Sequence, residues 1–163
     1  MDKQQIGLIG KHILIANLIA GNLEVAEPLR DRGIDLIAFR DGMDGGEFEA
    51  CPIQLKTASD ATFSLDEKYE RFSELRIVYV WGAENPANAS IFALTYQQAK
   101  SILEDMKFAK SPTWENTRKY TQTRPSKVLK DKLKDYLIVD PIEWPKRLGM
   151  KESSVASTKS NRR

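Results

Sequence analysis

The sequence predicts a mixed α/β domain in which a central sheet is flanked by helices. Three features predict it: a helical apolar pattern near the N-terminus, several β-favouring apolar runs, and a capped helix after the last run. The 163 residues are enough for one domain. We expect that domain over residues 1–150, with a basic helical extension over 106–150 and a disordered basic tail over 151–163.

The first element is a helix expected over residues 6–20, where apolar residues recur at helical spacing. Gly21 and Asn22 tolerate the left-handed backbone that ends a helix. A short extended segment over 23–26 follows. Residues 34–39 are almost entirely apolar, as is typical of a buried strand.

The next strand is expected to fold back as a hairpin, because residues 41–46 are rich in Asp and Gly. It covers 48–57, and Pro52 within it marks a bulge or a sheet edge. A short helix is expected over 65–72. Residues 76–81 are β-favouring and predict another buried strand.

A further strand is expected over residues 90–94, followed by a helix that Thr95 caps and that runs to residue 106. Residues 107–124 combine basic and aromatic side chains without a clear period. An amphipathic helix is expected over 126–136. Together these segments predict a helical, basic C-terminal appendix.

Composition excludes several classes of protein. No apolar run approaches the roughly 18 residues that cross a bilayer, so we expect no membrane association. The lone Cys51 excludes an internal disulfide and agrees with a cytoplasmic location. The single His12 argues against a zinc enzyme, and on a mostly apolar helix we interpret it as structural.

Charge is distributed unevenly along the chain. Residues 1–106 carry 10 Lys/Arg against 17 Asp/Glu, a net charge of −7, whereas residues 107–163 carry 15 against 6, a net charge of +9. Such asymmetry suggests a polyanionic partner, although a solvated basic tail would give the same count.

Polar side chains at the end of one expected strand form the strongest functional signal. A strand alternates its side chains, so Gln54 and Lys56 share a face while Leu55 points the other way. Asp35 lies 19 residues before Gln54, on the preceding strand. An acid, an amide and an ammonium together can hold a divalent cation and a phosphate. The alternative is an edge strand with a solvated polar face.

This pattern resembles the PD-(D/E)XK nuclease superfamily, which includes restriction endonucleases and archaeal Holliday junction resolvases. It is most similar to small bacterial members in which Gln replaces the second acid. The resemblance covers residues 6–57 in motif detail and 76–106 in element order. Its residues are Gly10-Lys11, Asn22 to Val25, Arg32 to Ala38 and Ile53 to Thr57.

The resemblance implies a restriction-endonuclease-like fold and metal-dependent hydrolysis of DNA phosphodiester bonds. Asp35 and Gln54 would bind Mg²⁺ or Mn²⁺, and Lys56 would position or activate the attacking water. Magnesium suits such a site because it takes few protein oxygens and keeps several waters.

One departure from the family pattern bears on activity. The family commonly has a Glu where this chain has Lys11. Either Lys11 turns to solvent while Glu24 or Glu27 assists Asp35, or the site no longer cleaves. In the second case Lys11 and Lys56 would bind a phosphate without metal.

The C-terminal segment supplies further candidates for nucleic-acid contacts: Lys110, Trp114, Arg118, Lys119, Tyr120, Arg124 and Lys127. Basic side chains bind phosphates, and aromatic ones stack on bases. Alternatively, the two aromatic residues pack over the sheet and the lysines form a solvated helix face.

The leading hypothesis is therefore a nuclease-like protein that acts on DNA with Mg²⁺ or Mn²⁺. The alternative is a catalytically inactive member of the same fold that serves as a DNA-binding or protein-interaction subunit, as a homodimer or with another protein. The third hypothesis is a structural domain whose polar strand face is only solvated by water.

Overall fold

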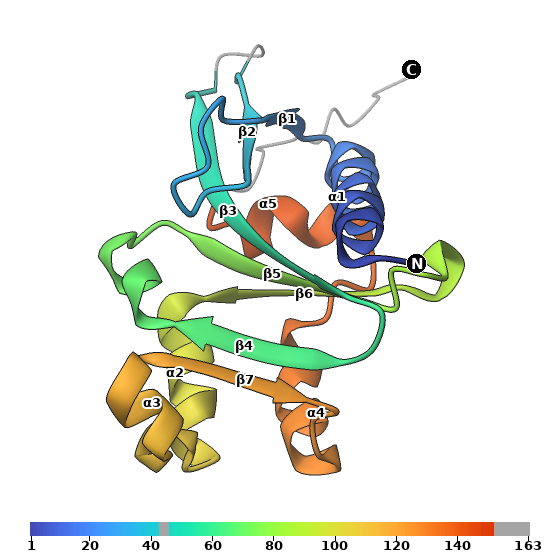
Figure 1. The fold of residues 1–163 in the computed structure, drawn as a ribbon. Coiled ribbons are helices and arrows are strands. Elements are labelled where there is room, and N and C mark those ends of the chain that lie inside the picture. Colours follow the sequence, from blue (N-terminus) through green and yellow to red (C-terminus); the bar gives the residue numbers. More distant parts are fainter. Residues whose placement is uncertain (43–45, 152–163) are drawn as a thin grey trace, which may run out of the picture.

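A mixed five-stranded sheet in the order β1-β2-β3-β5-β6 organises the protein (Figure 1). The computed structural model describes residues 1–42 and 46–151. Neighbouring strands pair antiparallel, except that β3 and β5 are parallel. The strands are β1 (Glu24–Ala26), β2 (Leu36–Arg40), β3 (Glu49–Ala58), β5 (Arg76–Trp81) and β6 (Ser90–Thr95).

A second sheet pairs β4 (Thr62–Asp66) with β7 (Lys119–Thr123), which lie side by side in Figure 1. The α-helices are α1 (Lys3–Ala20), α2 (Tyr96–Asp105), α3 (Pro112–Thr117), α4 (Lys127–Leu133) and α5 (Trp144–Arg147). Short 3-10 helices cover Glu67–Arg71, Pro86–Asn88, Phe108–Lys110, Lys134–Tyr136 and Pro141–Glu143.

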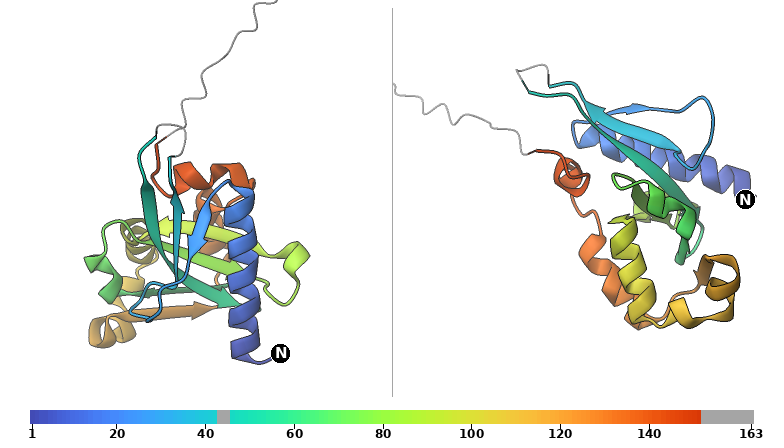
Figure 2. Two further views of the ribbon diagram at one scale, coloured as in Figure 1. Left: turned by 90° about the horizontal axis from the view of Figure 1, so that it is seen from above. Right: turned by 90° about the vertical axis from the view of Figure 1, so that its left-hand side faces the viewer.

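The five-stranded sheet has a hydrophobic core on each face. One core joins Val78 and Val80 of β5 to α1 and α5. The other joins Ile77 and Tyr79 of the same strand to α2, α3, α4 and β4. Figure 2 shows α1 beside the N-terminal strands, away from α2, α3 and α4. Strand alternation in β5 therefore assigns each side chain to one of two layers.

The close approach of α1 to β3 depends on Gly10. A Cβ at this position would overlap the side chain of Thr57. The helix begins with a capping box, in which Asp2 accepts a hydrogen bond from the backbone of Gln5 at 2.8 Å. The helix that precedes the strands is thus fixed both at its start and at its contact with the sheet.

Most expected elements are confirmed. Helix α1 and strands β2, β3, β5 and β6 occupy the predicted segments. Thr95 caps α2 as predicted and forms a capping box with Gln98. The antiparallel pairing of β2 and β3 agrees with the predicted hairpin, but residues 43–45 of its turn lie outside the described residues, as do 152–163 of the predicted tail.

No helix within residues 1–42 and 46–151 combines the length and the apolar content that crossing a bilayer requires.

Two expected segments were assigned wrongly. Residues 65–72 are not one helix, because they include the end of β4 and the 3-10 helix Glu67–Arg71. The C-terminal segment is not purely helical either, since it contributes β7 to the second sheet. Strand β7 reads Lys-Tyr-Thr-Gln-Thr and has little apolar character, so its pairing with β4 is not evident from its own sequence.

Pro52 lies inside the main sheet, in β3 between β2 and β5. It pairs with Ile37 of β2, while the pairing with β5 begins one residue later, at Ile53 and Arg76. The strand therefore has a neighbour on only one side at this position, which is where a residue without an N–H is tolerated.

Candidate functional site

Asp35 and Gln54 are in direct contact at the start of β2. The Gln54 side-chain Nε2 donates to Asp35 Oδ2 at 2.5 Å, and the Leu55 backbone N–H donates to the same oxygen at 2.7 Å. Asp35 is held in turn by its backbone N–H, which donates to the Ile53 carbonyl at 2.8 Å. The two strands therefore bring these side chains together, as their spacing predicts.

Gln54 is buried, with 7% of its surface exposed. Its Nε2 also donates to the Leu55 carbonyl at 3.1 Å, but its Oε1 has no hydrogen-bond partner among the described residues. A buried acceptor without a partner is costly, so this oxygen is an energetic weak point of the cluster.

Lys56 shares a sheet face with Gln54, since the two residues pair with Tyr79 and Ile77 of β5 in the parallel register. Its Nζ donates to the Tyr69 hydroxyl at 3.3 Å and lies 5.2 Å from the centre of that ring. This face is the one opposite the core that α1 covers.

Tyr69 is a site residue that the sequence did not identify. Its side chain is almost fully buried, and Lys68 lies over its ring, with Nζ 5.0 Å from the ring centre. Burial raises the pKa of the Tyr69 phenol, while nearby Lys56 opposes that rise. The phenol therefore stays neutral, and its oxygen accepts the hydrogen bond from Lys56.

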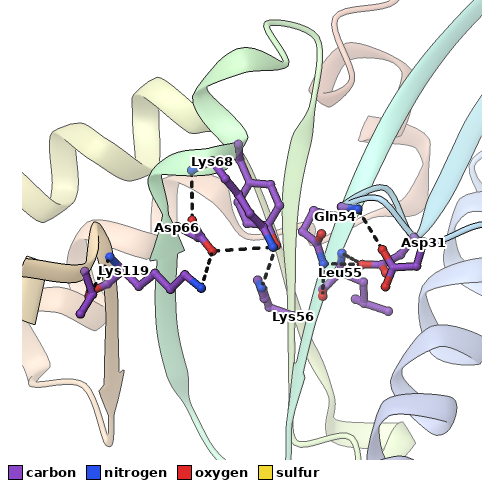
Figure 3. A network of polar contacts seen from close by, with 11 residues as sticks. Asp31, Gln54, Leu55, Lys56, Asp66, Lys68 and Lys119 are labelled. Carbon is purple, nitrogen blue, oxygen red and sulfur yellow. Dashed lines mark hydrogen bonds and ion pairs between the residues drawn. The ribbon is translucent and has the colours of Figure 1, made fainter.

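Gly33 brings the chain against Tyr69 just before Asp35. It adopts φ +94°, and a Cβ there would lie 3.3 Å from Tyr69 Cε1. The side chain of Asp31 accepts a hydrogen bond from the Gly33 N–H at 2.9 Å, as Figure 3 shows beside Gln54 and Leu55. This turn sets the position from which Asp35 reaches Gln54.

The electrostatic environment links Asp35 to both lysines. Burial raises the pKa of the Asp35 carboxyl, and the Leu55 N–H bond opposes that rise most strongly. Asp31 also raises this pKa, whereas Lys56 and Lys11 lower it. The Lys56 ammonium therefore favours the ionised carboxylate, although burial outweighs it.

Lys11 forms an ion pair with Glu27, with Nζ 3.2 Å from Oε2. The expected assistance of Glu27 to Asp35 is thus replaced by a contact with Lys11. His12 is exposed, and its Nδ1 lies 2.8 Å from the Leu8 carbonyl of its own helix.

The donor set can accommodate a metal only if the Gln54 amide turns over. The described residues contain no group of three or more His, Cys, Asp and Glu suited to a metal ion. Because an amide nitrogen and oxygen have similar shapes, a 180° turn would exchange them and direct Oε1 toward Asp35 Oδ2 and the Leu55 carbonyl. One carboxylate, one amide and one carbonyl oxygen suit Mg²⁺, which completes its shell with water.

A pocket of about 280 Å³ opens beside Lys56. It is lined by Leu55, Lys56, Thr57, Ala58, Thr62 and Ser64. One ammonium and three hydroxyl-bearing side chains therefore surround a space in which an anionic group would find both charge and hydrogen-bond donors.

The two aromatic candidates of the C-terminal segment pack into the protein. Trp114 is buried, with 4% of its surface exposed, and Tyr120 stacks on Phe108 with ring centres 4.5 Å apart. Base stacking by Trp114 was a wrong interpretation, because its ring fills the core beneath the second sheet. The packing alternative is confirmed for this residue.

Several basic candidates of the same segment are paired with acids. Arg118 lies 3.8 Å from Glu67 and Lys119 lies 3.6 Å from Asp66. Lys127 pairs with Asp131, four residues away on its own helix, at 3.0 Å. These exposed pairs partly neutralise the positive charge of the segment.

Lys110 and Arg124, by contrast, are exposed, and neither has an acidic partner within the described ranges. These two candidates keep their positive charge free for an anion.

Fold and geometry together define a mixed α/β protein with a five-stranded mixed sheet and a polar cluster at the start of β2. None of the family models, curated proteins or solved structures compared with the chain matches it. Its function is therefore argued from its own residues.

Proposed function

We propose that the protein is a nuclease-like protein that acts on DNA, with phosphodiester hydrolysis dependent on Mg²⁺ or Mn²⁺. The observation that supports the proposal is the placement of the side chains: Asp35 and Gln54 lie side by side, and Lys56 shares the sheet face of Gln54. A turn of the Gln54 amide would bring its unpartnered Oε1 to the ion, which adds support.

Asp35, Gln54 and the Leu55 carbonyl would hold the ion. When bound, the ion supplies an acidified water and offsets charge that develops on the phosphate. Lys56 borders the pocket, where its ammonium would bind a phosphate oxygen and orient the water. Tyr69 restrains this ammonium through its hydroxyl.

The test is nicking of supercoiled plasmid by the purified protein with Mg²⁺ or Mn²⁺, with EDTA as the blank. We expect metal-dependent nicking that falls about 100-fold or more in Asp35→Ala and in Lys56→Ala, since each change removes a group that acts in the transition state. Nicking that persists in both variants would refute this catalytic assignment.

A second candidate function is an inactive nuclease-like subunit that binds DNA or a protein partner. The observation that favours it is that the Gln54 amide already satisfies Asp35 without a metal, while Lys11 adds a cation to the surroundings of that carboxyl. It predicts salt-sensitive DNA binding in EDTA and no nicking. Gain of metal-dependent nicking in Lys11→Glu would identify a site that has lost an acidic ligand.

A further inference from the structure

The second sheet presents a face covered with hydroxyl groups. Directly opposed residues of an antiparallel pair lie on the same face, and here Thr62 pairs with Thr123 and Ser64 with Thr121. Burial alternates along both strands, with these four residues outward and Phe63 and Leu65 of β4 inward. We call Thr62, Ser64, Thr121 and Thr123 the hydroxyl face.

Exposed cations border one end of the hydroxyl face. The next pair along the sheet joins Asp66 to Lys119. Asp66 lies 3.6 Å from Lys119 and 3.7 Å from Lys68, so one carboxylate serves two ammonium groups (Figure 3). The side chains of Lys68 and Lys119 are 52% and 66% exposed, whereas that of Asp66 is only 15% exposed. A ligand on this face would therefore meet the lysines first.

The opposite end carries a cation as well. Arg124 directly follows β7, and its backbone N–H donates to the Ala61 carbonyl at 3.2 Å, next to the start of β4. Arg124 is exposed and has no acidic partner among the described residues. The hydroxyl face is thus bounded by positive charge at both ends.

The hydroxyl face continues into the candidate site. Thr62 and Ser64 line the pocket of about 280 Å³ that also contains Lys56. Strand β4 is fixed there by β5, because Tyr79 and Trp81 donate side-chain hydrogen bonds to the carbonyls of Ser64 and Thr62 at 2.6 and 2.8 Å. The position of the face relative to Lys56 is therefore rigidly set.

We propose that the hydroxyl face binds the sugar-phosphate backbone of DNA and leads it to Lys56. Ser and Thr hydroxyls, like Lys and Arg, are among the side chains that bind phosphate and sugar, and such contacts do not read sequence. An apolar partner would leave these hydroxyls without hydrogen bonds. The inference rests on the proposed function and names the binding surface for that site.

The test measures binding of a fluorescent duplex and of a single-stranded oligonucleotide by anisotropy, in EDTA and over a range of salt. Thr121→Glu places a negative charge in the middle of the face, on an exposed position. We expect its affinity for DNA to fall at least 10-fold. The matched control is Thr113→Glu, an exposed threonine of α3 that lies outside the face and should bind like the wild type.

A second variant covers the case in which Thr121→Glu fails to fold, as judged by thermal unfolding. Lys119→Gln removes one phosphate contact and should lower the slope of log affinity against log salt by about one. If folded Thr121→Glu keeps the wild-type affinity and Lys119→Gln keeps the wild-type salt slope, the hydroxyl face does not bind DNA. The nicking assay would still test the proposed function separately. If the wild-type protein binds neither oligonucleotide, both the DNA-binding role of the hydroxyl face and the proposed action on DNA are wrong.

Discussion

At the scale of single residues, the chemistry of the site depends on which atom of Gln54 faces Asp35. With Nε2 at 2.5 Å from Oδ2, the amide donates a hydrogen bond to the carboxylate, and the two groups satisfy each other without a metal ion. With the amide turned, two oxygens would face each other, which is favourable only with a cation between them or with a proton on Asp35. Burial raises the pKa of Asp35, so the local environment already disfavours a carboxylate that has no counter-charge.

Gln54→Glu tests this directly through stability. A second carboxyl group beside Asp35 in a buried position should lower the free energy of unfolding by about 3 kcal/mol in EDTA at pH 8, because two carboxylates at this distance repel each other. Mn²⁺ or Mg²⁺ should then raise the melting temperature of the variant more than that of the wild type. Differential scanning calorimetry measures both effects.

The control is Gln97→Glu, at an exposed position in the first turn of α2, where an acid is tolerated. If Mg²⁺ and Mn²⁺ do not change the melting temperature of Gln54→Glu, the side chains of this cluster do not act as metal ligands.

The sequence was sufficient to predict the contact of Asp35 with Gln54. Strand alternation placed Gln54 and Lys56 on one face, and the hairpin placed Asp35 beside Gln54, whereas Lys56 donates to Tyr69 instead. Tyr69 could not be predicted, because it reaches Lys56 from a 3-10 helix whose position depends on tertiary packing. Trp114 was misassigned because a sequence does not show which face of a short helix is buried.

At the scale of elements, helix α1 and strand β3 meet at Gly10. The helix contains two glycines with opposite surroundings: an added Cβ at Gly10 would overlap Thr57, whereas one at Gly7 would meet no heavy atom within 4 Å. Both glycines lie within α1, so a Gly→Ala substitution changes helix propensity in the same way at the two positions.

Gly10→Ala should destabilise the protein by about 1–3 kcal/mol, because the methyl group forces α1 away from β3. Gly7→Ala is the matched control and should stabilise by up to about 1 kcal/mol, the difference in helix propensity between the two residues. Urea unfolding followed by circular dichroism gives both values. Equal effects of the two substitutions would show that α1 does not lie as close to β3 as described.

The second sheet shows where sequence patterns fail at this scale. Strand β4 continues the chain from β3, but its partner β7 lies more than 50 residues later and has little apolar character of its own. Pairing between distant strands depends on register and packing, which local periodicity does not report. The hydroxyl face therefore became visible only in the structure.

At the scale of the whole molecule, the C-terminal segment is part of the core. Trp144 of α5 is fully buried, and its indole N–H donates to the Asn17 side chain of α1 at 2.6 Å. Arg118, Lys119 and Lys132 pair with acids of the N-terminal two-thirds of the chain. The charge asymmetry of the sequence is therefore partly balanced within the fold.

Trp144→Ala should lower the free energy of unfolding by about 3–5 kcal/mol, the usual cost of deleting a buried aromatic side chain. The loss should appear in a single cooperative transition, because α1 and α5 share one core. The control Ile142→Ala changes an exposed side chain two residues earlier and should alter stability by less than about 0.5 kcal/mol. A Trp144→Ala variant as stable as this control would mean that the C-terminal segment is a separate appendix after all.

Catalysis at Lys56 is tested by the initial rate of plasmid nicking in Mg²⁺, compared for the wild type, Lys56→Ala and Thr113→Glu prepared in parallel. We expect equal rates for the wild type and Thr113→Glu, a rate at the EDTA blank for Lys56→Ala, and unchanged folding of all three proteins. A wild-type rate no higher than the blank, or full activity without Lys56, would contradict catalysis at Lys56.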